Sequence, residues 1–196
     1  MRILPAPLPS GLPSAFGLLA DELEAIGVTN FSGLHRVRDW APQPLGRDYR
    51  AKLEGHASLE LPRVHPAVES SDGSTRLLLE AHDGQRYETV VMPRATRSPR
   101  TTLCLSSQIG CAMGCTFCAT GTRGIIRNLS AGEIVAQVHV ALQATEPLHE
   151  DALNLVFMGQ GEPLHNLDEV HRAIRVLCDP RGLGVHDKRI TVSTSG

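Results

Sequence analysis

Three cysteines, Cys111, Cys115 and Cys118, lie within eight positions of the stretch "SSQIGCAMGCTFCAT". Clustered thiols in a cytoplasmic chain more often bind a metal than form disulfides. A structural zinc ion needs four ligands, usually two close pairs, so three thiolates suit it poorly unless Cys104 or His139 completes the set. An iron–sulfur cube held by three cysteines would leave its fourth iron open to a small molecule. The spacing therefore favours a cluster of that kind over zinc.

Composition limits the class of protein that carries these thiols. The chain has 196 residues, of which 41% are hydrophobic and 20% charged, with a net charge of −2. These values are typical of a globular protein with one or two domains. The first seventeen residues are too rich in proline for a signal peptide, and no apolar run approaches a membrane span. We therefore expect a cytoplasmic protein with no membrane partner.

Five arginines are candidates for contacts with nucleic-acid phosphates, although clustered arginines are often merely solvated. They are Arg94, Arg97, Arg100, Arg123 and Arg127.

The first half of the chain predicts a small helical domain followed by a β-hairpin. Residues 1–60 contain a helix that Ser14 caps and Gly27 ends, an apolar set over 31–40, and a plausible helix around 47–53. Residues 61–96 read as a connector in which "STRLLLEA" and "RYETVVMP" are strands joined through Asp83-Gly84. We interpret residues 1–60 as an accessory domain that binds RNA.

From residue 101 onward, strands and helices alternate. We expect strands over 101–107, 153–158 and 189–194, and helices whose capping boxes are Ser130 with Glu133 and Asn166 with Glu169. Such alternation predicts a parallel α/β sheet, either doubly wound or a barrel. In both, the loops at the carboxyl ends of the strands form the site, and "IGCAMGCTFC", "GQGEP" and "STSG" all fall there. Three strands are about half of a barrel, so the chain reads as part of a longer protein.

The motif Cys-x-x-x-Cys-x-x-Cys over 111–118, with an aromatic before its last cysteine, resembles the radical S-adenosylmethionine (SAM) signature. Its context, with "VFMGQGEPLHNLDEV" and "RITVSTSG", resembles the RlmN/Cfr family of RNA adenine methyltransferases, and the RlmN branch in particular. The resemblance runs from about Ser70 to Gly196. It implies a partial radical-SAM (β/α) barrel preceded by the hairpin connector and the helical N-terminal domain, with residues 97–196 as the first half of the radical SAM core.

The resemblance also implies roles for individual residues. The residues that would hold a [4Fe-4S] cluster are Cys111, Cys115 and Cys118. The residues that would contact S-adenosyl-L-methionine are Gly161, Glu162 and Ser193. Glu88 matches a proton acceptor, and Cys104 matches a cysteine that resolves a protein–RNA adduct. Without the resemblance, a strand glutamate is usually a solvated residue and a strand cysteine a small hydrophobe.

The implied reaction methylates carbon 2 of adenine in 23S rRNA, at the peptidyl-transferase centre, and in tRNA. It uses two SAM molecules and an electron donor such as flavodoxin, and we expect a monomer. The methyl-carrying cysteine lies late in the family's sequence, and Cys178, in "VLCDP", does not match its motif. We therefore expect this chain to be a fragment that at most assembles a cluster and binds SAM weakly, without methylating RNA alone. The alternatives are a Cfr-type enzyme that methylates carbon 8 and a zinc-stabilised nucleic-acid-binding module.

Overall fold

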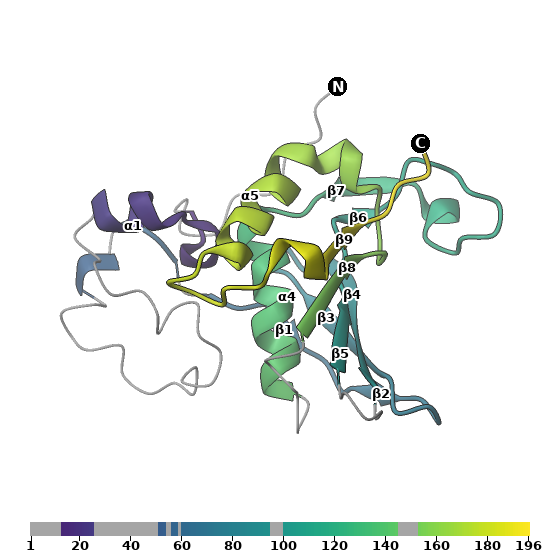
Figure 1. The fold of residues 1–196 in the computed structure, drawn as a ribbon. Coiled ribbons are helices and arrows are strands. Elements are labelled where there is room, and N and C mark those ends of the chain that lie inside the picture. Colours follow the sequence, from purple (N-terminus) through teal and green to yellow (C-terminus); the bar gives the residue numbers. More distant parts are fainter. Residues whose placement is uncertain (1–12, 26–50, 54–55, 59, 95–99, 145–152) are drawn as a thin grey trace.

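The computed structural model describes residues 13–25, 51–53, 56–58, 60–94, 100–144 and 153–196. Its centre is a mixed sheet in the order β1-β3-β4-β5-β8-β9, with β2 also paired to β3 (Figure 1). The strands of this sheet are β1 (Arg63–Val64), β2 (Val68–Glu69), β3 (Thr75–Glu80), β4 (Arg86–Arg94), β5 (Arg100–Cys104), β8 (Leu153–Phe157) and β9 (Ile190–Val192). The helix expected over 31–40 lies outside the described residues.

The predicted hairpin is confirmed, and its strands extend the same sheet beside the parallel strands. β3 and β4 are antiparallel and join through a turn in which the Gly84 N–H donates to the Ala81 carbonyl at 2.9 Å. β4 then pairs antiparallel with β5, with Val90 opposite Cys104. β5, β8 and β9 are parallel, as the alternation of strands and helices predicted. The α/β fold class is thus confirmed.

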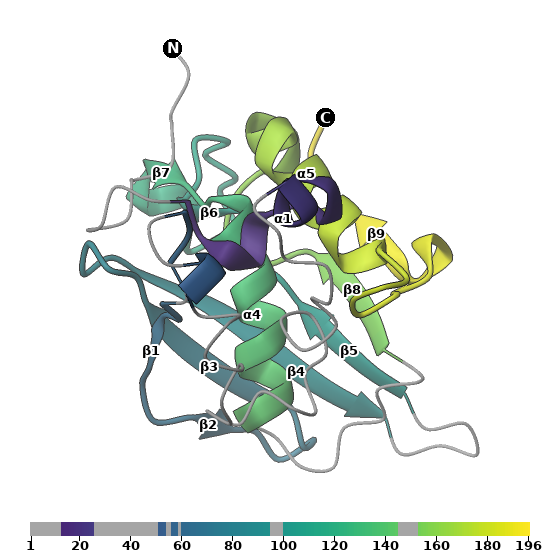
Figure 2. The same cartoon turned by 90° about the vertical axis from the view of Figure 1, so that its left-hand side faces the viewer.

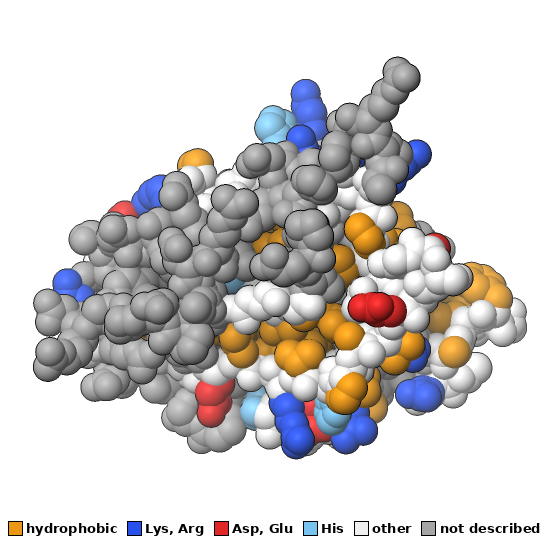
Figure 3. Space-filling view, turned by 90° about the horizontal axis from the view of Figure 1, so that it is seen from below, with side chains coloured by type: hydrophobic (Ala, Val, Ile, Leu, Met, Phe, Trp, Pro, Cys, Tyr) orange, Lys and Arg blue, Asp and Glu red, His pale blue; other side chains and the backbone are white. Residues whose placement is uncertain are grey.

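Helices α4 (Ala131–Ala144) and α5 (Leu167–Cys178) lie against the sheet (Figure 2). Residues of β3, β4, β5 and β8 alternate between buried and half-exposed, because successive strand residues point to opposite faces. The largest fully buried side chains on these strands are Leu77, Leu79, Tyr87, Leu103 and Phe157. Seen from below, hydrophobic side chains occupy the middle of the molecule, and Lys and Arg side chains lie mainly along its edges (Figure 3). Among the described residues, no helix is both long and apolar enough to cross a membrane.

Of the two predicted capping boxes, the structure contains the one before α4 and not the one before α5. Before α4, the Glu133 N–H donates to Ser130 Oγ at 3.2 Å and the Ser130 N–H donates to Glu133 Oε2 at 2.9 Å, which confirms the first box. The second is wrong, because Asn166 precedes α5 without a side-chain cap. Its amide instead donates to two buried carbonyls, and Glu169 accepts from the Ala131 N–H at 2.7 Å. Both side chains therefore join distant segments of the chain.

The helix expected to start at Ser14 is broken into a short 3-10 helix, η1 (Ala15–Gly17), and α1 (Ala20–Ala25). The break lets η1 pack closely on α4, since a Cβ on Gly17 would lie 2.7 Å from the Gly132 nitrogen. Arg172 of α5 also donates to the Gly17 carbonyl at 2.8 Å. The first described segment is thus fixed to both helices.

Candidate functional site

Three loops meet at one end of the sheet, where the parallel strands end at their carboxyl termini. The cysteine loop follows β5, the "GQGEP" loop follows β8, and the "STSG" segment follows β9 beside the cysteine loop (Figure 1). Direct hydrogen bonds join these loops: the Ser107 N–H donates to the Gln160 carbonyl at 2.8 Å, and Ser195 donates to Glu162. The convergence expected from the strand order is therefore present.

The cysteine loop is held at its base by a hairpin that the sequence did not predict. Strand β6 (Gln108–Gly110) pairs antiparallel with β7 (Ile125–Asn128), and the Cys111 N–H donates to the Gly124 carbonyl at 3.0 Å. Gly110 has a φ of +77°, and a Cβ there would collide with the Gly124 carbonyl oxygen, so only glycine fits. The run "IIRN" is the one local signal for this hairpin.

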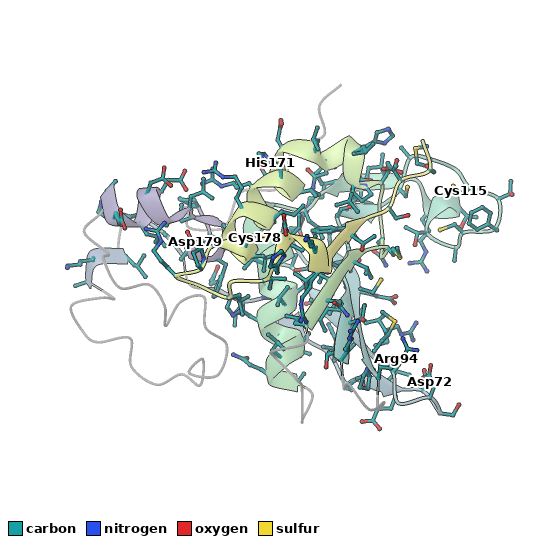
Figure 4. The ribbon with its side chains drawn as sticks, viewed as in Figure 1. Asp72, Arg94, Cys115, His171, Cys178 and Asp179 are labelled. Carbon is teal, nitrogen blue, oxygen red and sulfur yellow. The ribbon has the colours of Figure 1, made fainter. Side chains whose placement is uncertain are left out.

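The three thiols lie on this loop, which projects away from the sheet near Cys115 (Figure 4). Cys111 is buried, whereas Cys115 and Cys118 are half-buried. The Gly121 and Thr120 N–H groups lower the pKa of the Cys118 thiol, since they stabilise the thiolate. Among the described residues, no group of three or more His, Cys, Asp or Glu side chains is arranged to hold a metal ion. The structure therefore gathers the thiols on one loop without bringing them into a ligand set.

The donor set nevertheless fits an iron–sulfur cluster better than zinc. Three soft thiol ligands occupy one short loop, and metal sites commonly become ordered only when the metal binds. Neither residue considered as a fourth zinc ligand lies with them. His139 is fully buried on α4, with its ring centroid 5.1 Å from that of Phe16, and Cys104 lies on β5.

Ser106, just after β5, is fixed by a buried amide. Its N–H donates to Gln137 Oε1 at 2.8 Å, and Gln137 Nε2 donates back to the Ser106 carbonyl at 2.9 Å. Ser106 Oγ donates to the Glu88 carbonyl at 2.6 Å and accepts from the Gln160 N–H at 2.9 Å. One residue thus aligns β4, α4 and the loop after β8.

Gln108, at the start of the cysteine loop, joins the loop after β8 to strand β7. Its Oε1 accepts from the Glu162 N–H at 2.8 Å, and its Nε2 donates to Asn128 Oδ1 at 2.7 Å. Asn166 donates to both the Ser107 and Leu129 carbonyls at 2.8 Å. These amides were not identified from the sequence, because residue type alone does not distinguish a buried amide from a solvated one.

Of the three predicted SAM contacts, Gly161 and Glu162 are built into this scaffold. Gly161 has a φ of +101°, and a Cβ there would lie 2.7 Å from the Gln108 nitrogen. Burial opposes ionisation of Glu162, but hydrogen bonds from Ser195, Leu164 and Thr194 outweigh it and lower the pKa of the carboxyl. Ser193 is exposed, two residues before Ser195.

Glu88 and Cys104 lie on the same face of the sheet, on adjacent strands. Both belong to the half-exposed set of their strands. Glu88 lines a cavity of about 440 Å³ together with Gly110, Thr120 and Gln160. Burial raises the pKa of the Cys104 thiol, and a contact with the Met158 N–H offsets this in part. The structure thus brings Glu88 to the cysteine loop.

The five arginines proposed for phosphate contacts do not form one cluster. Arg94 and Arg100 pair in register at the far end of β4 and β5, and Arg97 lies outside the described residues. The expectation for Arg127 is wrong: its side chain is 8% exposed and pairs with Asp83 at 2.7 Å and Glu133 at 2.8 Å. Of the four arginines in this set that the structure describes, only Arg123 lines the cavity.

Comparison with known proteins agrees with this geometry. The profile of the Radical SAM superfamily matches residues 105–196. The chain belongs to the radical SAM superfamily. A solved radical SAM methyltransferase from Sphaerobacter thermophilus superposes on this radical SAM chain with a TM-score of 0.80 at 37% identity, covering 94% of this chain and 57% of that one.

Individual relatives narrow the superfamily to one kind of methyltransferase. A protein of Nitratidesulfovibrio vulgaris (strain DP4), named dual-specificity RNA methyltransferase RlmN, is 45% identical over 199 residues, covering 91% of this chain and 54% of that protein. One of the same name from Halorhodospira halophila is 48% identical over 153 residues, covering 78% and 41% respectively. The predicted resemblance to the RlmN/Cfr family is confirmed. This radical SAM chain spans about half the length of these relatives.

Proposed function

We propose that this protein is a radical SAM RNA methyltransferase that modifies adenine. The observation that carries the proposal is the meeting of a three-cysteine loop, a buried carboxylate on the next strand loop and a Glu88-lined cavity at one end of the sheet. The names of the relatives support an RNA substrate. Such a site combines residues that bind a cofactor with a cavity that takes the adenine base of the substrate.

In this proposal Cys111, Cys115 and Cys118 hold a [4Fe-4S] cluster. When bound, the cluster supplies the electron that cleaves SAM to a 5′-deoxyadenosyl radical. Gly161 and Ser193 line the cofactor, and the Glu162 carboxylate attracts its amino group. Since hydrogen bonds already favour the ionised form, Glu162 carries its charge at neutral pH.

Glu88 and Cys104 move protons in this proposal. Glu88 lines the cavity with Arg76 Nη1 3.5 Å from its Oε1, and its carboxyl group is placed to accept a proton from a substrate bound there. Because burial raises its pKa, the Cys104 thiol keeps its proton at neutral pH. It can therefore donate that proton when a protein–RNA adduct is resolved.

We assign the substrate as adenine, methylated at carbon 2 in 23S rRNA, at the peptidyl-transferase centre, and in tRNA. The proposal includes an electron donor such as flavodoxin, a cytoplasmic location and a monomer. The relatives are named dual-specificity RNA methyltransferases, which supports the choice of two RNA classes. Carbon 8 is the competing position, and mass spectrometry of the modified nucleoside distinguishes the two.

The test begins with anaerobic purification and analysis of iron and sulfide. We expect about four of each per chain, and 5′-deoxyadenosine when SAM and a reductant are added. Methylation is then measured with the full-length protein and RNA, because the transfer needs a methyl-carrying cysteine outside the matched motifs. A colourless protein that contains zinc and resists reconstitution with iron would contradict the proposal.

A further inference from the structure

The cavity that contains Glu88 has an arginine-rich wall. Arg76 comes from β3, Arg86 from β4 and Arg123 from η3 (Gly121–Arg123) of the cysteine loop. Arg76 and Arg86 belong to one hairpin, whereas Arg123 comes from a separate segment later in the sequence. The hairpin and the cysteine loop therefore place positive charge on both sides of one cavity of about 440 Å³.

The arginines are only partly neutralised. Arg76 lies 3.5 Å from Glu88, and its side chain is 52% exposed. Arg86 donates to Glu80 at 2.9 Å, and Glu80 also pairs with His65. Arg123 forms no ion pair with any residue that the structure describes. Since Glu88 is the only acidic residue among those that line the described cavity, its wall carries an excess of positive charge.

The chemistry of such a wall suits a phosphodiester backbone. A guanidinium group binds phosphate oxygens with paired N–H donors and keeps its charge at all physiological pH values. A single SAM carboxylate would need one such group, whereas an RNA strand brings a phosphate with every nucleotide. A strand crossing this wall would also bring a base next to Glu88.

We propose that Arg76, Arg86 and Arg123 bind backbone phosphates of the RNA strand whose adenine is modified. This inference rests on the proposed function and adds the part of the site that positions the strand. The contacts fix orientation without reading sequence, because phosphates are the same at every nucleotide.

The experiment measures binding of a fluorescently labelled, adenine-containing single-stranded RNA to the iron-loaded protein over a range of salt concentrations. The variants are Arg123→Gln, Arg76→Gln and Arg123→Lys. The matched control is Arg94→Gln, an exposed arginine at the end of β4 away from Cys115 (Figure 4). Iron content is measured for each variant, so that a misfolded cysteine loop is recognised.

For each glutamine variant we expect affinity to fall about threefold or more at 0.1 M salt, and the slope of log K against log salt to decrease by about 0.7. Arg123→Lys keeps most of the slope because it keeps the charge. The control changes neither value.

An unchanged affinity and slope, an equal effect of Arg94→Gln, or a wild-type protein that does not bind the RNA would each overturn the inference. So would a loss of SAM binding without a loss of RNA binding. Formation of 5′-deoxyadenosine by the wild type is measured separately: its absence would count against the proposed function, while arginine-dependent RNA binding would still support the phosphate site.

Discussion

The Glu162 carboxylate accepts two hydrogen bonds from Ser195, at 3.0 Å from the backbone N–H and 3.1 Å from the hydroxyl. These bonds join the loop after β8 to the segment after β9, which the sequence separates by about thirty residues. Because Glu162 also accepts from the Leu164 N–H, its orientation is fixed before any cofactor arrives. A preorganised carboxylate loses little entropy when it binds an amino group.

Replacing Glu162 by glutamine should weaken SAM binding. The variant removes the negative charge while keeping the shape, and a hydrogen bond to a charged group is worth roughly 1.5–3 kcal/mol, so we expect a rise in Kd of about tenfold or more. Equilibrium binding of SAM to the iron-loaded protein measures this. Glu69→Gln, on exposed β2, is the control and should leave the Kd unchanged. Equal affinities for wild type and Glu162→Gln would remove Glu162 from the cofactor site.

Replacing Arg127 by methionine should destabilise the fold by about 3 kcal/mol or more, because the buried Glu133 would be left without its cation and the more exposed Asp83 would also lose its partner. Arg127→Lys should recover only part of this loss, since lysine cannot pair with both carboxylates through a planar fork. Urea denaturation measures the free energy of unfolding. The control, Arg181→Gln, breaks exposed ion pairs and should cost far less stability, because water screens such pairs. Similar losses in the two variants would contradict the structural role of Arg127.

The ion pair between Arg127 and Asp83 makes the free energy of unfolding depend on pH. Burial opposes ionisation of Asp83, but hydrogen bonds and charge from Arg127 outweigh it and lower its pKa. A lowered folded-state pKa stabilises the fold above the unfolded-state pKa of about 3.9, and the contribution disappears as pH falls through the folded-state value. Asp83→Asn should therefore reduce the loss of stability below about pH 4, relative to wild type. Melting curves from pH 7 to pH 2 measure the difference, and a variant that loses stability as steeply as wild type would contradict this linkage.

The three cysteines on the loop should each be needed to retain iron, whereas the cysteine on α5 should not. Serine at 111, 115 or 118 removes one thiolate ligand, so each variant should retain little iron after anaerobic reconstitution. Cys178→Ser is the control, since Cys178 ends α5 away from the cysteine loop (Figure 4) and should keep the full iron content. Iron retained equally in all four variants would mean that the loop does not hold the cluster.

Local patterns predicted the elements, whereas contacts between distant segments could not be predicted. Alternation and apolar runs identified β3, β4, β5 and β8, and the order of strands implied that their loops would meet. Arg127 was misassigned because an arginine in the sequence carries no sign of burial, and its partner Asp83 lies 44 residues away. Asn166 resembles a helix cap for the same reason: only the fold brings the Ser107 carbonyl within its reach.

Gln137 offers the most direct test that this scaffold of buried amides positions the site. Its amide makes two hydrogen bonds to Ser106, and replacing it with methionine keeps the volume but leaves the Ser106 N–H and carbonyl without these partners. Each unsatisfied buried group costs about 1–3 kcal/mol, so Gln137→Met, which leaves two such groups, should lower the free energy of unfolding by roughly 2–6 kcal/mol. Gln143→Met, an exposed glutamine on the same helix, is the matched control and should change it by less than about 0.5 kcal/mol.

A positioning role also predicts a change that stability alone does not explain. Ser106 Oγ contacts both the Glu88 carbonyl and the Gln160 N–H, so its displacement should shift the loop that carries Gly161 and Glu162. At a temperature where Gln137→Met is still fully folded, its affinity for SAM should therefore be several-fold weaker than that of wild type. If the folded variant bound SAM as tightly as wild type, Gln137 would be a stabilising residue that leaves the site unaffected.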